Sequence, residues 1–301
     1  MTFQSSVERR RCQFLFYGVL RHRRRIETLL TGLIPRRPKP RLWAMLEIAV
    51  YELMEAGPER QPKVVDYAVG EIRKAMGKGE AGLANAVLRK IPKADAELEK
   101  TASAGVRTSH PDWLAKKWEG RFGPEAAEQL MRWNLQTPEV CLRVRDEAGV
   151  ELAQAQAMAA GEGELFEPTP WPGFVSLAGE FSRAEPLLKN GALYAQDAST
   201  RLAPEALAVK PGDYVLDLCA APGGKTLMLA DSLGTDTSGL LLAVELPGSR
   251  LEQLDENLQK LNDGDGPAVS LLATDVLTLT SEHFAEQGLP DKYDAVLLDA
   301  P

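Results

Sequence analysis

The stretch Asp217-Leu218-Cys219-Ala220-Ala221-Pro222-Gly223-Gly224-Lys225-Thr226 decides the fold of the C-terminal part of this 301-residue chain. It joins a predicted strand, Tyr214 to Cys219, to a predicted helix, Thr226 to Leu233. Two glycines allow the backbone to approach a bound molecule closely, and the start of a helix offers free N–H groups. Open α/β sheets bind ligands at this place, outside the carboxyl ends of their strands. We therefore predict a ligand site in this loop.

Strands continue to alternate with helices beyond this loop. Further strands are predicted at Leu240 to Leu246, Val269 to Ala273 and Tyr293 to Asp299, with helices at Ser249 to Leu261 and around Glu282. Repeated βα units of this length predict a parallel, doubly wound sheet. The last strand is apolar enough to be buried on both faces. Because the chain stops at Pro301, where the sheet edge would stay open, we expect residues 191–301 to be the first part of a truncated domain.

The loop does not match the two commonest nucleotide-binding patterns. A P-loop requires glycine at the position of Cys219, and a dinucleotide fingerprint requires G-x-G-x-x-G, which is missing. The remaining interpretation is that the loop binds a cofactor with one ribose and a charged amino-acid tail. Such a cofactor predicts an acidic residue at the end of the next strand, where Glu245 stands, and Asp275 and Asp299 end the two strands after it.

The first part of the chain has a different pattern. Residues 1–92 are predicted to be all-helical, since apolar residues recur at helical spacing from Leu42 to Leu53 and from Val64 to Ile72. Residues 93–107 are polar and Ala-rich, as a linker would be. We therefore predict that residues 93–190 form this linker followed by a small α+β module.

Charge is distributed unevenly. The net charge is −8, yet residues 1–41 hold eleven Lys or Arg residues against two acidic ones. A local basic face can bind phosphate backbones even on an acidic protein. A solvated helix surface is the alternative interpretation of such a run.

The cysteines and the hydropathy exclude several classes. Cys12, Cys141 and Cys219 are too few and too scattered for a disulfide framework or a zinc site, so we expect no metal and a cytoplasmic protein. No apolar run approaches the roughly 18 residues of a membrane span. Cys219 is interpreted as a small apolar residue beside the loop.

Several motifs together resemble the RsmB/Sun family of RNA cytosine-C5 methyltransferases. The stretch from Cys219 to Lys225 is similar to the cofactor motif of that family, and Ala243-Val244-Glu245 to its ribose motif, with Glu in place of the more usual Asp. Asp299-Ala300-Pro301 resembles the start of the Asp-Ala-Pro-Cys motif. Further matches are Gly191 to Ser199, Ser109 to Leu114 and, for a NusB-like RNA-binding domain, Leu83 to Arg89.

The resemblance implies a cofactor, a substrate and a division of the chain. S-adenosylmethionine would be the cofactor, and small-subunit ribosomal RNA would be the substrate. The protein would be a monomer. Residues 1–92 would form the NusB-like domain, 93–190 the linker and RNA-recognition module, and 191–301 the truncated Rossmann-like methyltransferase domain. The implied cofactor contacts are Cys219, Ala220, Ala221, Pro222, Gly223, Gly224, Lys225, Glu245, Asp275 and Asp299.

The chemistry of the family sets an expectation for activity. A cysteine thiolate adds to C6 of cytosine, which makes C5 nucleophilic enough to attack the methyl group. The resemblance places this cysteine after Pro301, so the chain as given is expected to be inactive. The alternative is a non-catalytic RNA-binding or scaffold protein with a NusB-like module. Salt-sensitive RNA binding without any need for cofactor would favour that alternative.

Overall fold

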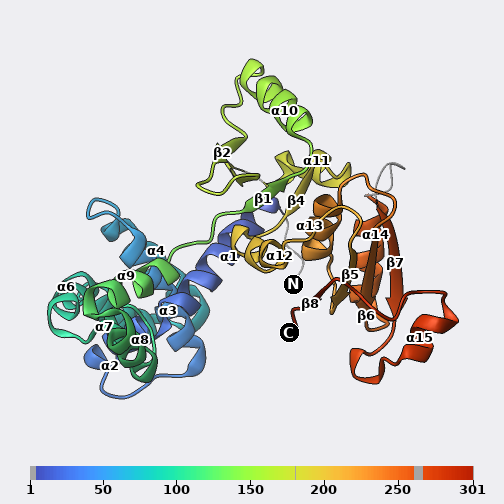
Figure 1. Cartoon of the computed structure of the whole chain (residues 1–301). Helices are drawn as coiled ribbons and strands as arrows, with labels where there is room; N and C mark the ends of the chain where they lie inside the picture. The colour runs from blue at the N-terminus through green and yellow to red at the C-terminus, as the bar shows by residue number, and fades with distance from the viewer. Residues whose placement is uncertain (1–4, 180, 261–266, 301) are drawn as a thin grey trace. The chain divides into compact units, whose positions relative to one another are not determined.

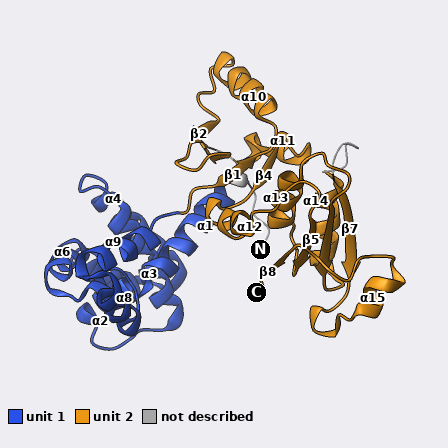
Figure 2. Ribbon diagram, in the orientation of Figure 1, with its two compact units in different colours: residues 1–137 blue, residues 138–301 orange. Residues whose placement is uncertain are grey.

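The chain forms two compact units, residues 1–137 and 138–301 (Figure 2). The computed structural model describes residues 5–179, 181–260 and 267–300. The sequence-based boundaries at residues 92 and 190 differ from this division, since helices beyond residue 92 belong to the first unit. Each unit has buried apolar clusters of its own.

The first unit is helical throughout its described part, as predicted for its first 92 residues. Its helices are α1 (Ser6–Arg21), α2 (Arg23–Leu33), α3 (Pro40–Glu55), α4 (Gln61–Met76), α5 (Lys78–Leu88), α6 (Ile91–Thr101), α7 (Ala104–Arg107), α8 (Asp112–Phe122) and α9 (Pro124–Asn134).

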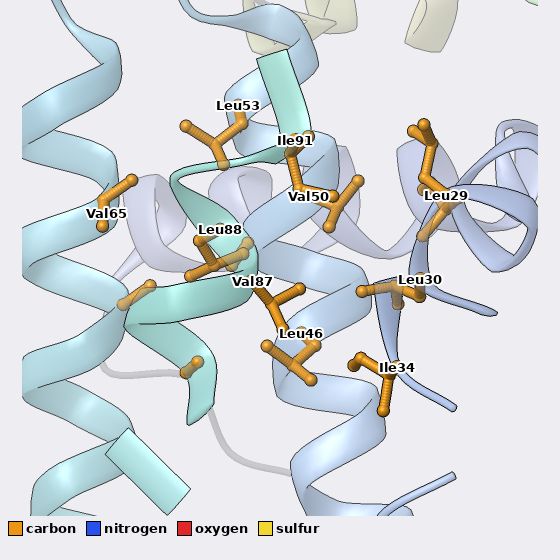
Figure 3. Close-up of a cluster of buried hydrophobic side chains, with 14 of the residues drawn as sticks. Leu29, Leu30, Ile34, Leu46, Val50, Leu53, Val65, Val87, Leu88 and Ile91 are labelled. Carbon is orange, nitrogen blue, oxygen red and sulfur yellow. The ribbon is translucent and has the colours of Figure 1, made fainter. Parts of the chain in front are cut away.

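Helix α3 lies at the centre of the main core of this unit (Figure 3). Leu42, Leu46, Ala49, Val50 and Leu53, the residues with helical spacing, are all buried. Figure 3 shows Leu46 and Val50 beside Leu30 of α2 and Val87 of α5, so helices distant in sequence meet on one apolar stripe.

The sequence predicts a linker over residues 93–107, and the structure has helices α6 and α7 there instead. Leu98 of α6 is buried in the main core. Arg25 of α2 donates to Asp95 at 2.7 Å and to Glu99 at 2.6 Å, so the polar residues that suggest a linker are partners in an ion-pair network. Such tertiary contacts outweigh a composition that is typical of linkers.

The second unit begins with a small antiparallel sheet. Its strand order is β2-β3-β1-β4, from β1 (Cys141–Val144), β2 (Phe166–Pro168), β3 (Phe174–Leu177) and β4 (Leu193–Ala195). Helices α10 (Glu147–Ala159) and α11 (Glu185–Lys189) complete this module, whose core includes Leu142, Val150, Phe166 and Leu187. A small α+β module was predicted here, but β4 extends it past residue 190.

A parallel sheet with strand order β7-β6-β5-β8 forms the rest of the unit (Figure 1). Its strands are β5 (Tyr214–Leu218), β6 (Leu240–Glu245), β7 (Ala268–Ala273) and β8 (Ala295–Leu298). The helices of this region are α12 (Leu202–Leu207), α13 (Gly224–Leu233), α14 (Ser249–Gln259) and α15 (Ser281–Glu286). The predicted helix end at Leu261 lies outside the described residues.

Helices cover both faces of this sheet, which confirms the doubly wound prediction. Leu241 and Ala243 of β6 pack with α13 and α14, whereas Leu242 and Val244 pack with Phe284 of α15. Alternate residues of a strand point to opposite faces, so a strand covered on both sides must be apolar at every position.

The prediction that the last strand is buried on both faces is wrong for β8. Leu297 is buried, but Val296 is 48% exposed and Leu298 is 60% exposed. Strand β8 pairs with β5 and is the last strand in the order. Among the described residues, nothing covers the face of β8 that carries Val296 and Leu298. Apolar composition alone does not report which face is covered.

Replacing Leu46 by Ala tests the position of the helical core. Leu46 is fully buried, so we expect Leu46→Ala to lower the free energy of unfolding by about 2–5 kcal/mol, through lost burial and the cavity left behind. Urea unfolding followed by circular dichroism measures this change. Ile48→Ala, on the same helix but 39% exposed, serves as the control and should cost clearly less. Equal losses for both variants would contradict this assignment of the core.

Candidate functional site

A cleft of about 390 Å³ lies at the carboxyl end of β5. Its walls come from the loop between β5 and α13, from β4 and the segment that follows it, from Arg250 of α14, and from Asp299 and Ala300 after β8. The residues that line it are Tyr194, Ala195, Gln196, Asp197, Thr200, Asp217, Cys219, Ala220, Ala221, Pro222, Gly224, Lys225, Arg250, Asp299 and Ala300.

The β5–α13 loop is held in place by hydrogen bonds to its backbone. The carboxylate of Glu245, at the end of β6, accepts the N–H of Ala221 at 2.9 Å. Arg250 donates to the carbonyl of Ala221 at 2.8 Å. Asn257 donates to the carbonyl of Pro222 at 2.8 Å, and the hydroxyl of Tyr194 donates to the same oxygen at 3.1 Å. Three elements outside the loop therefore determine its path.

The two glycines of the loop have distinct roles. Gly223 has φ of +106°, a backbone conformation that favours glycine. Gly224 begins α13, and a Cβ there would come within 3.2 Å of Tyr194 and 3.3 Å of Gln196. Glycine at position 224 thus allows the segment after β4 to pack directly on the first turn of α13.

Asp217 is a buried carboxyl group in the wall of the cleft. It is 1% exposed and accepts the hydroxyl hydrogen of Thr226 at 2.6 Å. Burial raises its pKa to about 6, although the hydrogen bond from Thr226 acts in the opposite direction. A buried carboxyl group with a perturbed pKa inside a cleft is typical of functional sites.

Most of the predicted cofactor contacts lie together in this cleft. Seven of the ten line it, namely Cys219, Ala220, Ala221, Pro222, Gly224, Lys225 and Asp299. Lys225 forms an ion pair with Asp299 at 2.6 Å, which connects α13 to the end of β8. Pro301, the last residue of the predicted Asp-Ala-Pro match, lies outside the described residues.

The other three predicted contacts do not line the cleft. Gly223 lies in the loop, with Leu254 3.0 Å from the position that a Cβ would take. Glu245 is buried and bound to Ala221. Asp275 accepts the N–H of Leu277 at 2.9 Å and caps a short 3-10 helix at residues Val276–Thr278.

Sequence reasoning missed the contribution of the small module to the cleft. Tyr194 of β4 and Gln196, Asp197 and Thr200, which follow that strand, all line it, although β4 belongs to the other sheet. A signal was present, since the stretch Gly191 to Ser199 resembles the same family as the loop does. Its position against α13 could not be derived from the pattern alone.

Two cysteines of this unit have raised thiol pKa values. Burial and the nearby carboxylates of Glu245 and Asp217 raise the pKa of Cys219. Burial also raises the pKa of Cys141. Because the thiolate is the reactive form, neither residue has the environment of an activated nucleophile.

Comparison with known families assigns both ends of the chain. Residues 204–301 match the model of the 16S rRNA methyltransferase RsmB/F family, and residues 3–93 match the NusB family. The two regions are thus similar to two different families, RsmB/F at the C-terminal end and NusB at the N-terminal end.

Curated relatives extend the similarity along most of the chain. The probable ribosomal RNA small subunit methyltransferase B of Bacillus subtilis (strain 168) is 30% identical over 302 residues, covering 95% of this chain and 64% of that protein. The Synechocystis protein of the same description is 28% identical, covering 85% of this chain and 59% of its own length. This chain thus spans less than two thirds of the length of either relative.

A solved structure has a similar fold. The crystal structure of PH0851 matches 99% of this chain and 67% of its own chain, with a TM-score of 0.64. The sequence identity is 21%, so this similarity shows the fold alone.

Two kinds of feature are absent from the part of the chain that the structure describes. Over residues 5–179, 181–260 and 267–300, we find no helix with the length and apolarity that crossing a bilayer requires. Across the same ranges, no group of three or more His, Cys, Asp or Glu side chains is arranged to hold a metal ion.

The raised pKa of Asp217 predicts a pH dependence of stability. The carboxyl group titrates at about 6 when folded, whereas an unfolded Asp titrates near ~3.9. The folded state therefore retains a proton that the unfolded state releases, and stability falls as pH rises between these values. Asp217→Asn keeps an acceptor for Thr226 and cannot ionise. From about pH 4 to about pH 7, we expect its unfolding free energy to gain roughly 2–3 kcal/mol relative to wild type.

Urea unfolding at several pH values measures this difference. Asp255→Asn, at an exposed position of α14, is the matched control and should show a much smaller change. A difference between Asp217→Asn and wild type that does not vary with pH would contradict the assignment.

Proposed function

We propose that this chain binds S-adenosylmethionine in the cleft beside β5, as part of a protein that methylates C5 of a cytosine in small-subunit ribosomal RNA. The observation that carries the proposal is the glycine-containing loop of residues 219–225, fixed by Glu245, Arg250 and Asn257 at the carboxyl edge of a parallel sheet. Residues 204–301, which contain this loop, match the RsmB/F family.

The residues of the cleft fit such a cofactor in size and chemistry. A volume of about 390 Å³ lies within the range of small-molecule sites, roughly 300–1,000 Å³. Gly224 lines the cleft, and the first turn of α13 offers N–H groups to a carboxylate. Glu245, which binds the loop at Ala221, would supply a carboxylate for the ribose hydroxyls, and Asp217 and Asp299 line the cleft.

S-adenosylmethionine supplies an electrophilic methyl group on its sulfonium. The residues of this chain would orient that group: the loop would bind the amino-acid end, Glu245 would hold the ribose, and Asp275, which follows β7, would contact the adenine. Arg250 holds the loop in place through its hydrogen bond to the carbonyl of Ala221. Positioning of this kind lowers the entropic barrier to transfer.

Attack on cytosine also requires a thiolate at C6. Cys219 and Cys141 have raised thiol pKa values, and Cys12 lies exposed on α1 of the helical unit. We therefore propose that residues 1–301 bind the cofactor but transfer no methyl group by themselves. This property also separates the proposal from a scaffold protein, for which cofactor binding is not expected.

The RNA partner is supported by the basic N-terminal segment. Arg9, Arg36, Lys39 and Arg41 are exposed in the NusB-family region. Clustered cations attract phosphate backbones by releasing condensed counterions, which makes binding sensitive to salt. We propose that this segment contributes to RNA binding.

Glu245→Gln tests the cofactor site. Glutamine retains an acceptor for the N–H of Ala221 but loses the charge that would accept hydrogen bonds from the ribose, so binding of S-adenosylhomocysteine should weaken by about tenfold. Isothermal titration calorimetry on the 301-residue chain measures this affinity. Glu252→Gln, at an exposed position of α14, is the control and should bind as wild type does.

Methyl transfer provides the second part of this test. The product of the whole gene, incubated with labelled S-adenosylmethionine and small-subunit ribosomal RNA from cells that lack it, should produce 5-methylcytosine. The 301-residue chain should produce none. A wild-type chain that does not bind S-adenosylhomocysteine, or a whole gene product that labels another base, would disprove the proposal.

A triple variant tests the RNA interface. In Arg9→Ala/Arg36→Ala/Lys39→Ala, each lost phosphate contact should lower the slope of log affinity against log salt by about 0.7–0.9. Filter binding of ribosomal RNA at several salt concentrations gives these slopes. Lys63→Ala/Lys116→Ala/Lys117→Ala removes equal charge outside the basic segment and should leave the slope closer to that of wild type. Equal slopes for both variants would argue against this interface.

A further inference from the structure

Gln196 is a buried polar residue in the wall of the cleft. It follows β4, lines the cleft and is 8% exposed. Its side-chain nitrogen donates to the hydroxyl oxygen of Thr200 at 2.8 Å and contacts the sulfur of Met228 at 3.2 Å. Its side-chain oxygen Oε1 is buried and has no hydrogen-bond partner among the described residues. A buried acceptor without a donor is costly, so this atom requires an explanation.

Neighbouring hydrogen bonds fix the orientation of this amide. The hydroxyl of Thr200 donates its hydrogen to the carbonyl of Asp197 at 2.6 Å. Its oxygen can then only accept from Gln196, which identifies the atom facing Thr200 as the nitrogen. Exchanging the two ends of the amide would place two acceptors against each other. The unpartnered atom is therefore the oxygen.

Free backbone donors line the same cleft. The amide of Gln196 lies over Gly224, where a Cβ would be 3.3 Å from its Cδ and 3.4 Å from its nitrogen. Gly224 begins α13, and the N-cap residue Gly223 offers no side chain to cap the helix. The first turn of a helix leaves N–H groups free for an anion. Gln196 and the first residues of α13 thus line the same cleft.

The carboxylates of the same cleft already accept hydrogen bonds. Asp197 accepts from Ser199, Asp217 from Thr226, and Asp299 from Lys225. In contrast, Oε1 of Gln196 is a neutral acceptor with its full capacity left. A free amino-acid group carries both an ammonium donor and a carboxylate acceptor, and this pair of charges matches the two kinds of group left unused here.

We propose that Oε1 of Gln196 accepts a hydrogen bond from the α-ammonium group of the amino-acid tail of the cofactor, while the first turn of α13 binds the α-carboxylate. This inference rests on the proposed cofactor. It makes Gln196 a binding residue supplied by the small module. It also gives a second reason why position 224 requires glycine, because a side chain there would displace the amide of Gln196 from the end of the helix.

Binding of two ligands by Gln196→Met tests this inference. Methionine keeps the length of the side chain and removes its polar atoms, so the affinity for S-adenosylhomocysteine should fall by about tenfold, as expected for one hydrogen bond to a charged group. The deaminated analogue of S-adenosylhomocysteine, which keeps the carboxylate and lacks the ammonium, should bind the variant and wild type within about twofold. Calorimetry on the 301-residue chain measures all four affinities.

Two further variants complete the design. Gln196→Glu keeps an acceptor for the ammonium group and should bind S-adenosylhomocysteine better than Gln196→Met does, although its second oxygen no longer donates to Thr200. Gln259→Met, at an exposed position of α14, should bind both ligands as wild type does. Melting temperatures identify any variant whose loss of binding results from unfolding.

The outcomes separate the two proposals. If wild type does not bind S-adenosylhomocysteine, the proposed function fails. If wild type binds it and Gln196→Met loses equal affinity for both ligands, or loses none, Gln196 does not bind the ammonium group and the inference is overturned.

Discussion

The hydrogen bond from the N–H of Ala221 to the carboxylate of Glu245 is the contact on which the site depends. It joins the end of β6 to the loop that follows β5, and its acceptor is buried. A charged acceptor in such surroundings makes a strong hydrogen bond, and its loss would leave a buried charge unpaired. With the loop fixed in this way, the carbonyls of Ala221 and Pro222 point to Arg250, Asn257 and Tyr194.

The cleft is a joint product of two sheets. The parallel sheet contributes the loop, and the small antiparallel sheet contributes the segment from Tyr194 to Thr200. Arg143 of β1 and Arg145, which follows that strand, both form ion pairs with Asp231 of α13, at 2.9 Å and 3.0 Å. These ion pairs keep the small module against the helix whose first turn faces the cleft.

The site contains polar groups that a purely structural core would avoid. Asp217 is buried beside other acidic residues, and Gln196 has an acceptor without a donor. Both arrangements cost stability, and neither is needed to close the sheet, whose cores are apolar. Buried polar groups that lower the stability of the fold in this way are concentrated at functional sites.

The sequence by itself determined the elements and their chemistry. Helical spacing identified α3 and α4, alternating βα units identified the parallel sheet, and the residues from Cys219 to Lys225 identified the loop, because these signals are local. Tertiary structure alone decided that residues 93–107 are helical, that one face of β8 is exposed, and that Tyr194 and Gln196 join the cleft. Each of these depends on contacts between residues far apart in the chain, such as Arg25 with Glu99 and Tyr194 with Pro222, which local patterns do not encode.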